Sequence, residues 1–256
     1  MQLASQGNTV TDPPPEDIAH EEFELPPAAG PPIGLWAPVA LALIAGYVDA
    51  IAFVNLFGVF PANQSGNAIL VGVAIGELDS GKILPPITSI TGFVVGVFLA
   101  VRLAYRIPRR WQIEILLIVQ IALLLITAIR LQFIPTSELP LSGTEGIFSL
   151  FAISGAMGVQ TYAVRATAGI PVSTTYQSGA LDQIARRTAI LSVGHKLPRH
   201  PVRLEVLGSI FLTYIVGAAL GAALGGDGPR LLWLSCIGTL LILIVRLART
   251  RGETRE

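Results

Sequence analysis

Residues 61–67 read Pro-Ala-Asn-Gln-Ser-Gly-Asn, and residues 171–180 read Pro-Val-Ser-Thr-Thr-Tyr-Gln-Ser-Gly-Ala. Each of these polar stretches begins at a proline, follows a long apolar segment, and precedes an apolar or helical segment too short to cross a bilayer. Paired interruptions in corresponding positions of two halves indicate a midplane site in a transporter built from repeats. The two stretches therefore predict a duplicated membrane protein.

The composition also indicates a membrane protein. Hydrophobic residues make up 52% of the 256 positions and charged residues only 13%, and the mean hydropathy is +0.65. A soluble domain carries about 25% charged residues. Because a helix needs roughly 20 apolar residues to cross the hydrocarbon of a bilayer, we expect spanning helices at 35–57, 86–106, 112–131, 146–165, 204–225 and 230–248.

The remaining segments give the expected domain organisation. Residues 1–34 form an acidic, proline-rich tail, which we expect to be disordered because it has too little apolar surface to offset the entropy of ordering. The predicted order is then a first membrane repeat at 35–131, an external linker at 132–145, a second membrane repeat at 146–248 and a basic cytoplasmic tail at 249–256.

Basic residues set the predicted orientation, because Lys and Arg concentrate in short cytoplasmic loops. They gather at 102–110, at 186–203 and at 246–255, whereas the linker 132–145 has none. This pattern predicts a cytoplasmic C-terminus. Orientation explains these basic clusters, and we expect no nucleic-acid partner.

The number of crossings separates two topologies. Segment 172–185 carries Thr175, Gln177 and Asp182, so we expect it to enter and return or to lie on the surface. Segment 61–77 is expected to do the same, because its apolar part is about half a span long. The fold class is then an all-α polytopic membrane protein with two inverted repeats, each of three spanning helices plus one short broken or re-entrant helix, and a cytoplasmic N-terminus. Alternatively, 61–77 crosses fully, which gives seven spans with the acidic tail outside.

Small residues support the repeat. Gly46 and Phe53 in the first span match Gly155 and Tyr162 in the second half at one constant offset. Glycines at small-xxx-small spacing let helix backbones approach closely in a membrane. We expect such packing at Gly92, Gly96, Gly217, Gly221 and Gly225. The sequence leaves open whether they pack within one chain or between chains of a homo-oligomer.

Asp49 lies near the middle of the first predicted span. Inserting a carboxylate at the bilayer centre costs about 2.5–3.5 kcal/mol of free energy on insertion scales. One interpretation is a carboxylate that couples transport to a proton or cation. The other is a structural hydrogen bond to the loop at Asn63–Asn67. The sequence favours neither.

Two interpretations also fit the polar stretches. As starts of half-helices, with Ser65 and Ser178 as suitable caps, they present free N–H groups that bind a small polar or anionic solute. Otherwise they only repair a broken helix, because lipid offers no hydrogen bonds. The first interpretation predicts a solute site that consists of Asp49, Asn63, Ser65, Asn67, Gln160, Tyr162, Thr175, Gln177 and Ser178.

Signatures of catalysis are scarce. The sequence has no HExxH, no GxSxG and no GxxxxGK[ST] motif, and its histidines, at 20, 195 and 200, lie outside the predicted spans. Cys236 is the single cysteine, which excludes an intrachain disulfide. We therefore expect no enzymatic activity, no cofactor and no metal.

Two motifs in order resemble the YoaK-like family of bacterial membrane proteins of unknown function. The first runs from Ala45-Gly46-Tyr47-Val48-Asp49-Ala50 to Asn63-Gln64-Ser65-Gly66-Asn67, and the second from Gly158-Val159-Gln160 to Thr174-Thr175-Tyr176-Gln177-Ser178-Gly179. The likeness covers roughly 35–248. This chain has serine at 65 and 178 where the family usually has threonine, which keeps the hydroxyl. The resemblance implies a polytopic inner-membrane protein and no established substrate.

Two functional hypotheses follow. In the first, the protein is a small-solute permease, and Asp49→Asn abolishes coupled uptake while the fold stays intact. In the second, it is a non-transporting membrane scaffold or sensor, and the same substitution mainly lowers stability.

Overall fold

The computed structural model describes residues 36–133, 143–168, 177–193, 204–225 and 232–253, and these ranges form helices and turns without a strand. Two of the α-helices are short, α2 (Gln64–Gly76) and α6 (Gln177–Ser192), and two 3-10 turns, η1 (Ser80–Lys82) and η2 (Arg109–Trp111), precede longer helices. The long helices are α1 (Trp36–Asn55), α3 (Leu84–Ala104), α4 (Gln112–Gln132), α5 (Gly143–Ala168), α7 (Leu204–Leu224) and α8 (Leu232–Glu253).

The six long helices are long and apolar enough to cross a membrane, which confirms the six spans predicted from hydropathy. The largest differences are at the ends of α5 and α8, where α8 continues to Glu253. Its last turns are rich in arginine, a good helix former that hydropathy does not register. The tail 1–34 and most of the linker 132–145 lie outside the described residues.

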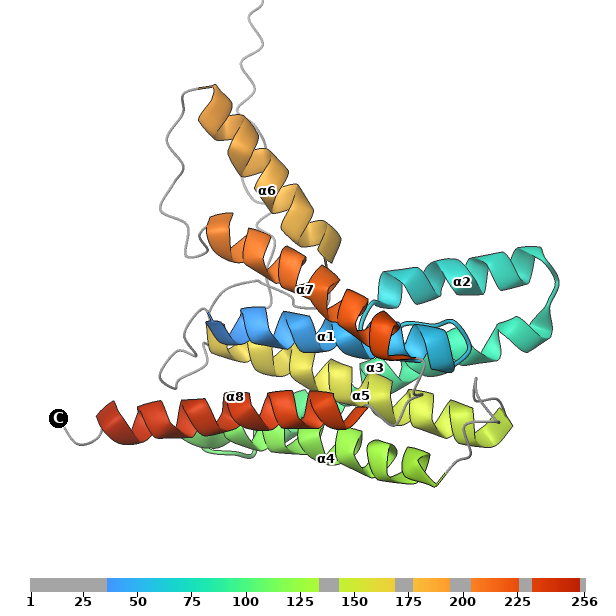
Figure 1. Ribbon diagram of the computed structural model, residues 1–256, viewed down its shortest axis with the longest axis horizontal. Coiled ribbons are helices and arrows are strands. Elements are labelled where there is room, and N and C mark those ends of the chain that lie inside the picture. The colour runs from blue at the N-terminus through green and yellow to red at the C-terminus, as the bar shows by residue number, and fades with distance from the viewer. Residues whose placement is uncertain (1–35, 134–142, 169–176, 194–203, 226–231, 254–256) are drawn as a thin grey trace, which may run out of the picture.

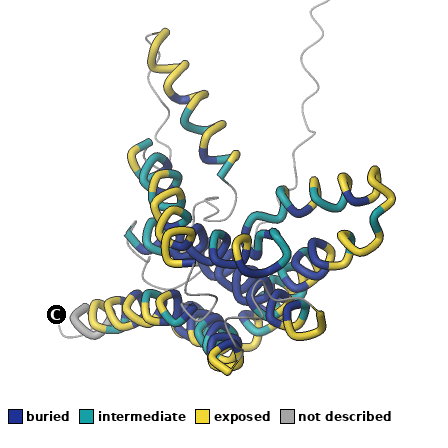
Figure 2. The backbone as a smooth tube through the Cα atoms, turned by 45° about the vertical axis from the view of Figure 1, so that its right-hand side comes forward, coloured by how far each residue is buried: buried dark blue, intermediate teal, exposed yellow. Residues whose placement is uncertain are grey.

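The helices pack mainly in two pairs, α1 with α7 and α3 with α5. Helix α4 joins them by packing on both α5 and α8, and α8 also contacts α1. The most buried spans are α5 and α1, which form the dark centre of the molecule in Figure 2. The core is therefore a layer of two central helices covered by four others.

The two short helices leave this core in different directions. Helix α2 packs on α3, and α6 packs on α7. Figure 1 shows that both begin near the middle of the bundle and then run toward opposite ends, α6 toward the end at which α8 ends. With 13 residues, α2 is about 20 Å long and is too short to cross the hydrocarbon.

Each main helix pair is held at backbone contact by glycines. A Cβ on Gly217 would lie 2.0 Å from the carbonyl oxygen of Leu43, and one on Gly96 would lie 2.1 Å from that of Gly155. A Cβ on Gly92 or Gly221 would lie 2.5 Å from the carbonyl oxygen of Phe151 or Tyr47, respectively. Gly225 differs, because its nearest neighbours are side chains of Val54 and Asn55 at 3.4 Å or more. These contacts lie within one chain.

After α1 the chain turns back sharply. Phe57 and Gly58 both have positive φ angles, 55° and 65°, a left-handed conformation that glycine adopts without strain. The ring of Phe60 then stacks on Phe53 with the centroids 4.9 Å apart. The turn therefore returns the start of α2 to the flank of α1.

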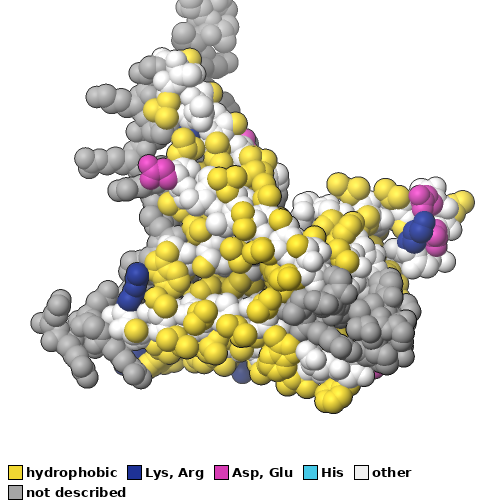
Figure 3. Space-filling model, in the orientation of Figure 1, with side chains coloured by type: hydrophobic (Ala, Val, Ile, Leu, Met, Phe, Trp, Pro, Cys, Tyr) yellow, Lys and Arg dark blue, Asp and Glu magenta, His cyan; other side chains and the backbone are white. Residues whose placement is uncertain are grey.

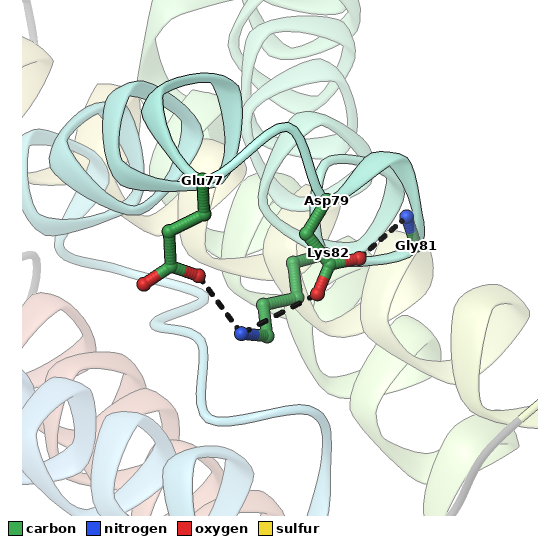
Figure 4. Close-up of polar contacts among 4 residues, drawn as sticks. All are labelled: Glu77, Asp79, Gly81 and Lys82. Atoms are coloured by element: carbon green, nitrogen blue, oxygen red, sulfur yellow. Dashed lines mark hydrogen bonds and ion pairs between the residues drawn. The ribbon is translucent and has the colours of Figure 1, made fainter.

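The far end of α2 carries the charged side chains of this hairpin. Lys82 Nζ lies 2.9 Å from Glu77 and 3.4 Å from Asp79, and Asp79 accepts a hydrogen bond from the Gly81 N–H (Figure 4). Figure 3 shows apolar side chains over the face of the bundle and this charged group at the tip. Such a division suits a membrane-embedded body with its charges at the ends.

Candidate functional site

Asp49 lies where three segments meet. Its side chain on α1 is buried, with 2% of the residue exposed. One carboxylate oxygen accepts a hydrogen bond from the backbone N–H of Ala62 at 2.6 Å, and the other accepts from the N–H of Asn63 at 3.1 Å and from the hydroxyl of Tyr214 on α7. The Asp49 carboxylate therefore holds the two residues that precede α2 and links them to α7.

A second network surrounds Asn67, one turn into α2. The Asn67 amide donates to the carbonyl of Phe60, to Gln64 and to Ser89, and its oxygen accepts from the Phe60 N–H. Ser89 on α3 also donates to the Phe60 carbonyl at 2.9 Å and lies 2.8 Å from the hydroxyl of Ser154 on α5. Polar side chains thus satisfy the backbone groups that the break before α2 leaves open.

The start of α2 is capped by Asn63. Its side-chain oxygen accepts from the N–H of Gly66 at 3.4 Å and from the hydroxyl of Ser65 at 2.8 Å. The sequence suggested Ser65 as a cap, but the helix begins at Gln64, so the cap position falls on asparagine, which serves it equally well. The Ser65 side chain is exposed.

Gln160 and Tyr162 belong to other parts of the core. The Gln160 amide donates to the carbonyl of Leu41 at 3.0 Å and accepts from Gln120 on α4 at 2.8 Å. Leu41 precedes Asp49 by about two helical turns, roughly 12 Å along the axis. Tyr162 packs with alanines of α3 and with Leu116 of α4. The contacts of these two side chains therefore connect α5 with α1, α3 and α4 rather than with Asp49.

The second polar stretch is described only from α6 onward. Thr175 lies outside the described residues, and Gln177 and Ser178 occupy the first turn of α6, half-buried and exposed. Ala180, the fourth residue of α6, packs in a cluster with Ala42 and with Tyr214 at its edge. Figures 1 and 2 both show the N-terminal end of α6 close to that of α2. Tyr214 therefore packs on the cluster that contains Ala180 of α6 and also binds Asp49.

Sequence reasoning missed the partners that complete these networks, Tyr214, Ser89 and Ser154. All three are hydroxyl side chains within apolar spans, where a hydroxyl normally finds a partner on a neighbouring helix. Tyr214 is the only tyrosine between Pro201 and the C-terminus, and a phenol within a predicted span was the available signal. A buried ion pair between Glu114 and Arg246 was missed as well.

The described residues offer no metal site. Across the five ranges that the structure describes, no three His, Cys, Asp or Glu side chains gather closely enough to hold a metal ion. The polar groups that bind Asp49 are two backbone amides, of Ala62 and Asn63, and the hydroxyl of Tyr214.

Comparison of the sequence with known proteins identifies its family. The family described as "Protein of unknown function (DUF1275)" matches residues 37–245. The chain is also 25% identical over 224 residues to "UPF0700 transmembrane protein YoaK" of Bacillus subtilis (strain 168), which covers 83% of this chain and 94% of that protein. No solved structure matches the chain.

Proposed function

Because the chain belongs to the DUF1275 family and is a multi-pass membrane protein, we propose that it is a small-solute permease built from two inverted repeats. The first repeat consists of α1 to α4 and the second of α5 to α8. The polar site lies where the break before α2 meets α1 and α7. No enzymatic activity forms part of the proposal.

The helix contacts support the repeat. Gly92 and Gly96 of α3 correspond to Gly217 and Gly221 of α7 at a displacement of 125 residues (92 to 217, 96 to 221). The residues that they contact are displaced by 108 residues (43 to 151, 47 to 155). This is one residue less than the offset that relates Gly46 to Gly155 in the sequence. Pairing of α1 with α7 and of α3 with α5 is the exchange that a pseudo-twofold axis between two repeats produces.

The short helices support the inverted orientation. Helix α2 follows the first helix of its half and packs on the next, and α6 does the same in the second half. Because they run to opposite ends of the bundle (Figure 1), the two halves would lie upside down relative to each other in a membrane. The usual bias of Lys and Arg toward cytoplasmic loops supports a cytoplasmic C-terminus, and with a re-entrant α2 the N-terminus would lie on the same side.

One observation carries the proposal of transport. The buried carboxylate of Asp49 in the first half holds the start of a broken helix and also binds the Tyr214 hydroxyl of the second half. Alternating access requires the two repeats to move against each other around a fixed site. A hydrogen bond that crosses between the repeats at the broken helix is suited to open and close with that movement.

A non-transporting scaffold or sensor is the second candidate. It is favoured by the way in which both oxygens of Asp49 and the amide of Asn67 find partners inside the chain. In that case the network only stabilises the broken element.

Uptake into reconstituted vesicles tests the proposal. Wild type is assayed against a panel of radiolabelled amino acids, sugars, carboxylates and phosphate, with and without a proton gradient. Asp49→Asn and Tyr214→Phe are compared with Ser154→Ala at equal amounts of folded protein. Ser154→Ala is the matched control, because it removes a buried hydrogen bond of the other helix pair, between Ser89 and Ser154, and leaves Asp49 untouched.

A permease accumulates at least one solute of the panel, loses uptake in Asp49→Asn and Tyr214→Phe, and retains it in Ser154→Ala. A wild type that matches empty vesicles throughout the panel would contradict the proposal. Equal losses in all three variants would assign the network a structural role only.

A further inference from the structure

Helices α4 and α8 share a buried ion pair. The Arg246 Nε donates to Glu114 Oε1 at 2.7 Å, and only 4% and 6% of the two side chains are exposed. Glu114 lies in the first turn of α4 and Arg246 near the end of α8. The pair therefore lies in the half of the bundle that contains the C-terminal end of α8 (Figure 1).

A second polar pair lies deeper in the same contact. Gln120 of α4 is fully buried and donates to Gln160 at 2.8 Å and to the hydroxyl of Thr239 on α8 at 3.3 Å. Gln120 follows Glu114 by six residues, about 9 Å along the helix. We refer to Glu114, Gln120, Thr239 and Arg246 as the α4–α8 seam.

Each α4 residue of the seam has an acceptor that the described residues leave open. Glu114 Oε2 and Gln120 Oε1 are buried, and neither accepts a hydrogen bond from any described side chain or backbone group. Asp49 differs, because described donors bind both of its oxygens. An open acceptor is most unfavourable at membrane depth, where lipid supplies no donor.

We propose that the α4–α8 seam binds water, which donates hydrogen bonds to Glu114 Oε2 and Gln120 Oε1. Water is the smallest donor that can enter such a contact, and buried water typically makes two to four hydrogen bonds to polar groups that the chain leaves open. The neighbouring Arg246, Thr239 and Gln160 supply further polar groups. The seam is then a second polar site that differs from the Asp49 site in having solvent as its ligand.

Radiolytic footprinting of the wild-type protein in a bilayer tests this directly. Hydroxyl radicals generated by X-rays from a bound water oxidise the side chains beside it, whether or not bulk solvent reaches them. Leu117 lies between Glu114 and Gln120 and is fully buried. Leu131 is the matched control on α4, of the same residue type and 1% exposed, and its place near the helix end brings it closer to bulk water.

We expect Leu117 to be oxidised severalfold faster than Leu131. Gln120→Leu, which removes one open acceptor, should lower the rate at Leu117 to that of Leu131. Thr127→Val, which removes a buried hydroxyl of α4 that donates to Leu123, should leave the rate at Leu117 unchanged. Equal slow oxidation of both leucines in the wild type would overturn the proposal. Because no transported solute is involved, this outcome is independent of the uptake assays.

Discussion

The two main helix pairs, α1 with α7 and α3 with α5, share a backbone contact and differ in the polar group beside it. In both pairs a glycine lies against the carbonyl oxygen of the facing helix, Gly217 against Leu43 and Gly96 against Gly155. Beside the first contact a carboxylate binds a phenol, and beside the second two serine hydroxyls meet.

The difference separates architecture from chemistry. Tyr214 and Ser89 stand at the same displacement of 125 residues (89 to 214) that relates the glycines of α3 to those of α7. Ser89 binds Ser154 of the other half and also the carbonyl of Phe60, in the segment before α2. Tyr214 binds Asp49 of the other half, which in turn binds the two residues that directly precede α2. Equivalent positions therefore serve the same break, but only one of them faces a carboxylate. The glycine contacts define the fold, and the Asp49 side is the candidate for function.

The largest expected effect comes from filling the glycine contacts. Gly96→Ala and Gly217→Ala should each lower the free energy of unfolding by about 3 kcal/mol, because the new Cβ would meet backbone that cannot move aside. Unfolding in detergent titrations measures this loss. Gly72→Ala is the control, since its Cβ would meet nothing within 4 Å, and alanine is the better helix former by about 0.8–1.0 kcal/mol. A loss of stability in only one of the two variants would contradict the equivalence of the α3–α5 and α1–α7 contacts.

Asp49→Asn should rank next. An asparagine presents one acceptor oxygen to the donors of Ala62, Asn63 and Tyr214, so buried N–H or O–H groups lose their partner. We expect the free energy of unfolding to fall by about 2–3 kcal/mol, with greater proteolysis at the start of α2. Unchanged stability together with lost uptake would instead match the purely functional interpretation of the sequence.

Tyr214→Phe should cost less, because the two backbone donors to Asp49 remain in place. Loss of one hydrogen bond to a charged group lowers the free energy of unfolding by about 1.5–3 kcal/mol at most, and we expect the lower end of this range. The ring still packs with the cluster that contains Ala180, so thermal unfolding should shift only modestly. A loss larger than that of Asp49→Asn would contradict this order, because Tyr214→Phe keeps the ring and removes only the hydroxyl that binds Asp49.

Ser154→Ala should have the smallest effect. Ser89 keeps its bonds to the Phe60 carbonyl and to Asn67, so we expect at most about 1 kcal/mol. The same unfolding titration measures it. An effect as large as that of Asp49→Asn would remove the distinction between the two helix pairs.

Hydropathy predicted the six spans because each one is set by the thickness of the bilayer. The spacing of Gly92 with Gly96 and of Gly217 with Gly221 indicated close helix contacts, but only the fold shows which backbone each glycine meets. Asp49 was identified by its cost in a membrane, and its structural interpretation already named the loop at Asn63 as the partner.

The rest of the site depends on tertiary pairing. The partner Tyr214 follows Asp49 by 165 residues, and no local pattern joins the two positions. Gln160 was assigned to the same site because it is polar and lies within a span, whereas its direction around α5 leads it to Gln120 and to Leu41. Which helices a single polar side chain contacts depends on how the helices pack around it. That packing cannot be read from one sequence.

A double-mutant cycle between Asp49 and Tyr214 tests most directly whether one carboxylate ties the break before α2 to the second half. The free energies of unfolding of wild type, Asp49→Asn, Tyr214→Phe and the double variant are measured under one condition. We predict a coupling energy of about 1–2 kcal/mol, as for residues in one hydrogen-bonded network. Strictly additive losses would contradict it.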